Sequence, residues 1–191
     1  MQYQKEEVRN RIIDAAFSEF EKNGFYRASM LQISTRAKVP IGNLYRYFKG
    51  KEALFKACVD SAYSYCLTLM DSVFDAGLNE AGYGGTTISL LKGAKSQGRG
   101  IKLLTEKSGG SEYSDFINQI TELGYRKLEE NFAAKGYPVD EFVAKTIAAN
   151  ITEGVLSVLT RAPEERRQDL MTKLMNFYFR DLGERVGGNG Q

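Results

Sequence analysis

The spacing of apolar and helix-breaking residues over the first 50 positions constrains the fold of this chain most strongly. An apolar side chain recurs at every fourth position in the series Val8, Ile12, Ala16 and Phe20. This spacing predicts an amphipathic helix over residues 5–23, which Gly24 ends. Two shorter helices are expected over residues 29–37 and 41–48, because Pro40 interrupts the helical pattern between them. A supporting helix followed by two short helices and a tight turn has helix–turn–helix geometry.

Local capping signals support these boundaries. Ser29 is a favourable N-cap residue, and Gln32 three positions later completes the pattern of a capping box. Gly50 then ends the last short helix, and a long fourth helix is expected to begin near Lys51. A three-helix corner in an ordinary all-α protein would have the same boundaries, so the neighbouring charges help to decide between the two interpretations.

Basic side chains are concentrated in this N-terminal region. Residues 22–51 contain seven Lys or Arg and no Asp or Glu. Residues 1–51 carry ten basic and five acidic side chains, whereas residues 52–191 carry sixteen basic and nineteen acidic ones. A stretch without acids favours binding to the phosphate backbone of a nucleic acid. A solvated basic surface is the alternative interpretation.

A pattern of fixed positions covers residues 8–55. It includes the runs Ile12-Ile13-Asp14-Ala15-Ala16, Gly24-Phe25, Ala28-Ser29, Ala37-Lys38-Val39, Gly42-Asn43-Leu44-Tyr45-Arg46-Tyr47-Phe48 and Lys51-Glu52-Ala53-Leu54-Phe55. This pattern resembles the N-terminal domain of the tetracycline-repressor (TetR) family. Beyond residue 60 the resemblance is one of architecture only.

The resemblance implies roles in DNA binding for particular side chains. The family's base-reading positions match Leu31, Ile41, Gly42, Asn43 and Tyr47. Its phosphate-binding positions match Tyr45 and Lys51, and its positions close to the DNA backbone match Ser29 and Pro40. Because Leu31 and Ile41 are apolar, few direct hydrogen bonds to bases are expected, chiefly from Asn43. Lys38 stands where the family usually has glycine, which should strain the turn slightly.

The rest of the chain is expected to form further helices and no strand. These helices cover residues 51–77, 86–95, 98–107, 112–135, 140–161 and 163–185, with a glycine-rich loop over residues 77–85. The predicted fold is all-α, with an N-terminal three-helix helix–turn–helix domain before a larger helical ligand-binding and dimerisation domain. The boundaries are residues 1–50 with the motif at 29–48, residues 51–186, and a flexible tail at 187–191.

Two apolar stripes near the C-terminus predict self-association. The residues expected at a dimer interface are Val143, Ile147, Ile151, Val155, Leu170, Leu174 and Phe177. The two helices carry more apolar surface than one core needs, and a helix–turn–helix reads two half-sites best as a dimer. A symmetric four-helix interface between two subunits satisfies both conditions. Burial inside one subunit is the alternative for part of these side chains.

Polar residues interrupt the most apolar of these helices and suggest a ligand pocket. The residues expected to line it are Tyr63, Cys66, Tyr113, Phe116, Asn150 and Glu153. A buried carboxylate is costly unless it is paired, so Glu153 would make the polar contact within an apolar wall. The alternative places Glu153 on an exposed edge or in the dimer interface, and the aromatic side chains in an ordinary core.

The composition argues against several other classes of protein. The chain has no histidine, which removes most zinc sites and the usual catalytic triads, so no enzyme activity, metal or cofactor is expected. Cys58 and Cys66 are two helical turns apart, about 12 Å, too far for a mutual disulfide and typical of buried thiols in a reducing cytoplasm. No signal peptide is evident, and no apolar run approaches 18 residues, so a cytoplasmic protein without a membrane partner is expected.

The resemblance implies a cytoplasmic, homodimeric transcription regulator that binds double-stranded DNA. It would be a repressor that a small, mainly apolar effector releases from a palindromic operator. One alternative is an activator, or a regulator on the same fold that responds to something other than a small ligand. A more distant alternative is an all-α enzyme or lipid-binding protein with a basic surface.

Overall fold

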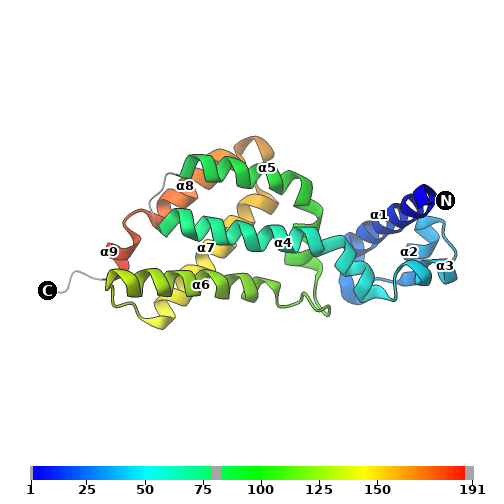
Figure 1. Cartoon of the computed structure of the whole chain (residues 1–191), viewed down its shortest axis with the longest axis horizontal. Coiled ribbons are helices and arrows are strands. Elements are labelled where there is room, and N and C mark those ends of the chain that lie inside the picture. The colour runs from blue at the N-terminus through cyan, green and yellow to red at the C-terminus, as the bar shows by residue number, and fades with distance from the viewer. Residues whose placement is uncertain (1, 79–82, 188–191) are drawn as a thin grey trace. The chain divides into compact units, whose positions relative to one another are not determined.

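The computed structural model describes residues 2–78 and 83–187. Helices connected by turns make up these residues, and no strand occurs among them, which confirms the predicted all-α fold class (Figure 1). The helices are α1 (Gln2–Arg27), α2 (Met30–Ala37), α3 (Ile41–Tyr47), α4 (Lys51–Leu78), α5 (Tyr83–Lys102), the π-helical η1 (Leu103–Lys107), α6 (Phe116–Lys135), α7 (Glu141–Arg161), the 3-10 helix η2 (Glu164–Arg166), α8 (Arg167–Phe179) and α9 (Leu182–Gly187). Part of the loop expected over residues 77–85, and the tail from residue 188, lie outside the described residues.

The chain forms two compact units. The first unit consists of Met1–Ser64 and Arg99–Phe116, and the second consists of Tyr65–Gly98 and Ile117–Gln191. This division differs from the boundary expected near residue 51, because the N-terminal half of α4 and the segment 99–116 group with the helix–turn–helix. The packing of Phe20 of α1 against Phe55 of α4 accounts for part of this difference.

A cluster of aromatic rings forms the centre of the first unit. Phe20 and Phe55 are fully buried, with ring centroids 4.9 Å apart at an angle of 87°, and Phe25 lies 5.2 Å from Phe55. Such edge-to-face contacts add to the apolar burial that drives folding. Gly24 has φ 69° and ψ 167° inside α1, so the chain bends there in a conformation that favours glycine, as the sequence predicts.

The segment 99–116 packs on α1 and α4 within this unit. The Arg99 guanidinium donates to both carboxylate oxygens of Glu21 at 2.8 and 2.9 Å, and lies 4.5 Å from the centre of the Phe17 ring. The predicted break between residues 95 and 98 is wrong, since α5 continues to Lys102. Gly100 does not end a helix but allows close packing. A Cβ there would lie 2.5 Å from the Cβ of Ala62, so helix α5 can approach α4 this closely only at a glycine.

The second unit is held together by α7 and by aromatic side chains. Phe74 of α4 and Phe179 of α8 pack edge to face at 5.7 Å. A Cβ at Gly124 would lie 2.4 Å from the Phe74 ring, so α6 also approaches at a glycine. The helix expected over residues 163–185 is divided, because Asp181 has φ 54° between α8 and α9.

Helix α7 is the most apolar of the second unit. Its 21 residues meet the length and composition of a membrane span, with a mean hydropathy of 1.3 over 18 residues of which 44% are buried. It is the one helix of the described residues that does so. Lys145 and Glu153 interrupt it, and the core helix of a globular unit passes the same test.

The two cysteines are free and buried, as expected. Cys58 belongs to the first unit and Cys66 to the second, both on α4. Burial raises the pKa of each thiol to about 12, so both remain protonated and unreactive near neutral pH.

Candidate DNA-binding interface

The turn between α2 and α3 is tight and fixed by hydrogen bonds. Lys38 adopts the left-handed conformation (φ 54°, ψ 42°), and its N–H donates back to the end of α2. The buried Ser34 hydroxyl donates to the Val39 carbonyl at 2.7 Å, while the Val39 N–H donates to the Ser34 carbonyl at 3.1 Å. A lysine in this conformation carries strain that glycine would avoid, in agreement with the expectation for this position.

Helix α3 is anchored by Leu44 and exposes most of its other residues. Pro40 precedes it, and the Pro40 carbonyl accepts from the N–H groups of Asn43 and Leu44 at 2.8 and 3.0 Å. Leu44 is fully buried and anchors the helix, whereas Gly42 and Asn43 are exposed. A Cβ at Gly42 would meet nothing within 4 Å, so no packing within the protein explains a glycine there. The space is open to a molecule that approaches from outside.

The structure places most of the predicted DNA-binding residues on the surface of the first unit. Leu31, Pro40, Ile41, Gly42, Asn43 and Tyr45 are exposed, and Ser29, Tyr47 and Lys51 are half-buried. Asn43 and Tyr47 line a groove of about 410 Å³ together with Arg46 and with two residues of α1, Lys5 and Val8. Arg46 was expected on the outward side of α3 without an assigned contact, whereas Lys5 was not predicted, although its charge could have indicated it.

Lys51 is held by the end of α1. Its ammonium group donates to the carbonyls of Tyr26 at 3.0 Å and Ala28 at 3.3 Å, and lies 4.6 Å from the centre of the Phe25 ring. An ammonium group has three N–H donors, so one remains for an external acceptor such as a phosphate. The position is therefore compatible with the predicted role, with the side chain already oriented by the protein.

The predicted capping box is wrong. Ser29 has the backbone conformation of an N-cap (φ −119°, ψ 127°), but its side chain makes no capping hydrogen bond. Glu19 of α1 supplies the acceptor instead, at 3.3 Å from the Ser29 N–H. The local pattern could not show this, because the acceptor comes from another helix ten residues earlier.

The six residues predicted for a ligand pocket do not gather in one unit. Tyr63, Tyr113 and Phe116 pack together in the first unit, with ring centroids 5.4 Å (Tyr63–Tyr113) and 5.8 Å (Tyr63–Phe116) apart. Cys66, Asn150 and Glu153 belong to the second unit. There Cys66 is buried, but Asn150 and Glu153 are exposed on α7, and Glu153 lies 3.6 Å from Arg161 in an ion pair. Glu153 therefore occupies an exposed edge and is not a buried polar contact.

Thr152 is a buried polar residue of α7 that was not among the predicted pocket residues. It is fully buried, and its hydroxyl has no hydrogen-bond partner among the residues that the structure describes. The second unit also contains a small cavity of about 70 Å³ at the ends of α4, α6 and α8, which Leu78, Phe132 and Phe179 help to line. None of the six predicted pocket residues lines this cavity.

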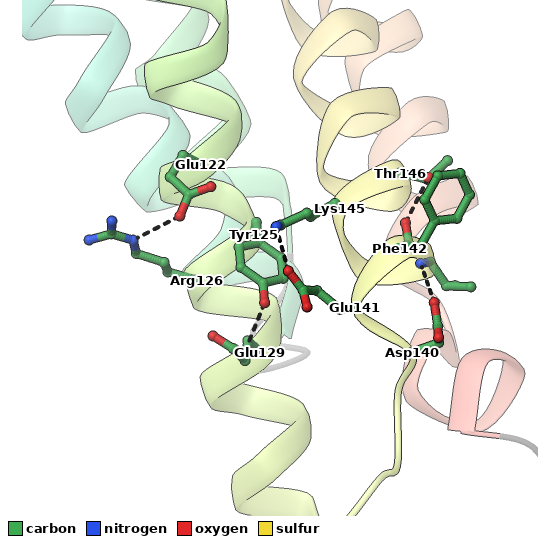
Figure 2. Close-up of polar contacts among 10 residues, drawn as sticks. Glu122, Tyr125, Arg126, Glu129, Asp140, Glu141, Phe142, Lys145 and Thr146 are labelled. Carbon is green, nitrogen blue, oxygen red and sulfur yellow. Dashed lines mark hydrogen bonds and ion pairs between the residues drawn. The ribbon is translucent and has the colours of Figure 1, made fainter.

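Exposed apolar side chains on α7 and α8 correspond in part to the predicted dimer interface. Phe142 is 77% exposed, Phe177 70% and Val143 40%, while Ile147, Leu170 and Leu174 are half-buried. In Figure 2 the Phe142 ring lies on the side of α7 that faces away from Tyr125 of α6. Ile151 and Val155 are fully buried within the second unit, so for these two the prediction is wrong and they belong to the core.

Polar contacts also stabilise the N-terminal end of α7. Asp140 caps the helix by accepting from the Val143 N–H at 3.2 Å, and Lys145 pairs with Glu141 (Figure 2). The Lys145 ammonium also lies 5.1 Å from the centre of the Tyr125 ring. Phe142 thus projects outward from a helix end at which Asp140, Glu141 and Lys145 all have partners within the protein.

Comparison with known proteins agrees with this geometry in the N-terminal region. Residues 12–58 match the family described as bacterial regulatory proteins, tetR family. The chain is 41% identical over 59 residues to the HTH-type transcriptional regulator UidR of Escherichia coli K12, which covers 31% of this chain and 30% of that protein. It is 47% identical over 49 residues to the A-factor receptor protein of Streptomyces griseus, covering 26% and 18%. The matching region thus spans less than a third of either relative.

The fold of the whole chain also has a known counterpart. NalD of Pseudomonas aeruginosa, described as the secondary repressor of the MexAB-OprM multidrug efflux pump, superposes with a TM-score of 0.57 over 94% of this chain and 99% of NalD, at 19% sequence identity. A second NalD structure gives 0.54 at 20% identity. These similarities show a shared fold, and the relatives matched in sequence include transcription regulators. Residues 12–58 of the chain therefore match the N-terminal domain of the tetR family of bacterial regulatory proteins.

Proposed function

We propose that this protein is a DNA-binding transcription regulator that acts in the cytoplasm. The observation that carries the proposal is the exposed face of α3, where Asn43 and Arg46 line an open groove and Gly42 leaves space for close approach. The segment that includes this face, residues 22–51, has seven basic and no acidic side chains. A helix of this kind enters the major groove of DNA in helix–turn–helix proteins.

The side chains on this face suggest how a DNA sequence is read. Asn43 can form two hydrogen bonds with an adenine, whereas Leu31 and Ile41 can contact only the methyl group of thymine. Tyr45 and the remaining donor of Lys51 would bind phosphates, which positions the protein without reading sequence. With few polar readers, part of the site preference would come from DNA shape.

Dimerisation would place two such faces on one operator. The exposed Phe142, Val143 and Phe177 form an apolar surface that a second subunit would cover. A two-fold symmetric pair reads a palindromic site, with the half-sites one helical turn apart or a multiple of this.

The regulatory step is proposed to be release of DNA by a small, mainly apolar effector that binds the second unit. Thr152 supports this, since a buried hydroxyl without a partner is a group that a ligand can satisfy. Release requires that the effector binds a DNA-incompetent form better than the DNA-bound form. Activation in place of repression is the alternative that a reporter experiment in cells would distinguish.

Selection of duplexes from a random pool with the purified protein tests the central proposal. The selected sites should be roughly palindromic, and affinity should fall by orders of magnitude, about 10³-fold or more, between 50 and 200 mM salt if six or more phosphates are contacted. Asn43→Ala should relax preference at one base pair, whereas Tyr45→Phe should weaken binding to all duplexes alike. An affinity independent of salt, or a pool without any enriched sequence, would contradict the proposal.

A further inference from the structure

Glu19 is a buried carboxylate beneath the helix–turn–helix. It lies on α1 between apolar core residues and is 1% exposed. A carboxylate removed from water is costly unless hydrogen bonds replace those it loses. Glu19 therefore needs hydrogen-bond donors within the first unit, whose other polar groups are mostly on the surface.

Three groups donate to this carboxylate. The Asn23 amide donates to Oε1 at 2.8 Å, and the Ser29 N–H donates to the same oxygen at 3.3 Å. The side-chain amide of Gln32 also faces Glu19. Because a carboxylate only accepts, the amide atom that faces it is the nitrogen, which lies 2.7 Å from Oε1 and 3.1 Å from Oε2.

These bonds join α1 to the first turn of α2. Ser29 is the N-cap of α2 and Gln32 lies in its first turn, so Glu19 binds the helix on both sides of Leu31. Leu31 itself is 64% exposed on the proposed DNA-reading face. The Ser29 side chain makes no capping bond, but its backbone N–H and the Gln32 amide both donate to Glu19, and these two bonds fix the orientation of α2 about its own axis.

We propose that Glu19 is a positioning residue for sequence recognition, which acts through Ser29 and Gln32 to hold α2, and with it Leu31, in the orientation that reads DNA. This inference rests on the proposed DNA-binding function. Glu19 does not touch DNA, because it is buried. Its effect is expected on discrimination between operator and other DNA more than on binding to phosphates, which other residues provide.

The test measures the ratio of affinities for a selected operator and for a scrambled duplex at fixed salt, with the full-length protein. Glu19→Leu keeps the volume of the side chain but removes every acceptor. This variant should lower the ratio of affinities about tenfold, which is the effect expected from the loss of one base contact. Glu19→Gln keeps an acceptor for the Ser29 N–H, and its amide nitrogen can donate to Gln32 once that amide turns over. It should therefore retain most of the discrimination. Glu7→Gln is the control, since Glu7 is exposed on the same helix and the substitution removes the same charge.

A double-mutant cycle separates this role from general stabilisation. Gln32 is exposed, so Gln32→Leu should fold normally and also lower the ratio. The double variant Glu19→Leu, Gln32→Leu should be no worse than Glu19→Leu alone, because Glu19→Leu already removes the contact to Gln32. If Glu19→Leu does not fold, Gln32→Leu compared with Glu7→Gln decides the question.

A folded Glu19→Leu or Gln32→Leu variant that keeps the wild-type ratio, or losses that multiply in the double variant, would overturn this inference alone. A wild-type protein that shows no preference for any duplex would overturn the proposed function and this inference with it.

Discussion

Lys38 shows how one residue sets the strain of the turn that presents α3. Its positive φ would suit glycine, yet the side chain adds a positive charge close to the proposed DNA surface. A non-glycine residue in the left-handed region destabilises the folded state by about 1–2 kcal/mol. Glycine avoids this strain, but part of the gain is lost because glycine raises the conformational entropy of the unfolded chain. The sequence resemblance indicated this position correctly, because turn geometry depends on the backbone of a few consecutive residues.

We expect Lys38→Gly to raise the free energy of unfolding by about 0.5–1 kcal/mol while weakening DNA binding through the lost charge. Denaturant unfolding would measure the first effect. Lys49→Gly is a matched control, because Lys49 is exposed and is not among the residues with positive φ. An equal gain in both variants would show that strain at Lys38 is not the cause.

Thr152 offers a second prediction for a single side chain. Its buried hydroxyl lacks a partner, so Thr152→Val, which has nearly the same shape, should stabilise the protein by about 1–3 kcal/mol. Thr160 on the same helix is the control, because its hydroxyl donates to the Leu156 carbonyl at 2.8 Å and Thr160→Val should bring no such gain. Thermal unfolding of both variants would check this, and a loss of stability in Thr152→Val would contradict it.

Helix boundaries could be predicted well from the sequence, whereas contacts between helices could not. Strong periodicity and terminal signals predicted α2, α3 and α4 to within a residue or two. Glycine misled the prediction at residue 98, since Gly100 marks close packing of α5 on α4 and no loop. Contacts between helices could not be predicted from local patterns. The hydrogen bond from the N-cap of α2 to Glu19, and the exposure of Asn150 and Glu153, depend on neighbours far away in the sequence.

The exposed face of α7 and α8 leads to a prediction about assembly. The protein should be a dimer at micromolar concentration, and Phe177→Asp should produce a folded monomer, because the ring is mostly exposed in the single subunit but would be buried in the pair. Sedimentation and circular dichroism would measure association and folding. Ile117→Asp, at an exposed apolar residue of α6, should leave the dimer intact. A wild-type monomer at these concentrations would contradict the proposed interface.

Charge is divided unevenly over the whole molecule. Residues 1–51 have twice as many basic as acidic side chains, whereas residues 52–191 have an excess of acids. The overall balance of +2 conceals this division. Counterion release depends on the basic groups that meet phosphate, so the position of a charge should matter more than the total.

Two substitutions that each remove one positive charge test this idea. Arg46→Ala removes a charge from the groove on α3, and we expect it to weaken binding and to reduce the slope of log affinity against log salt by about one. Lys173→Ala removes a charge from α8, where Lys173 pairs with Asp169 at 2.9 Å, and should leave both quantities unchanged. Binding titrations at several salt concentrations would measure both slopes. Equal effects would mean that net charge alone attracts DNA, and that the face of α3 does not form the phosphate-binding surface.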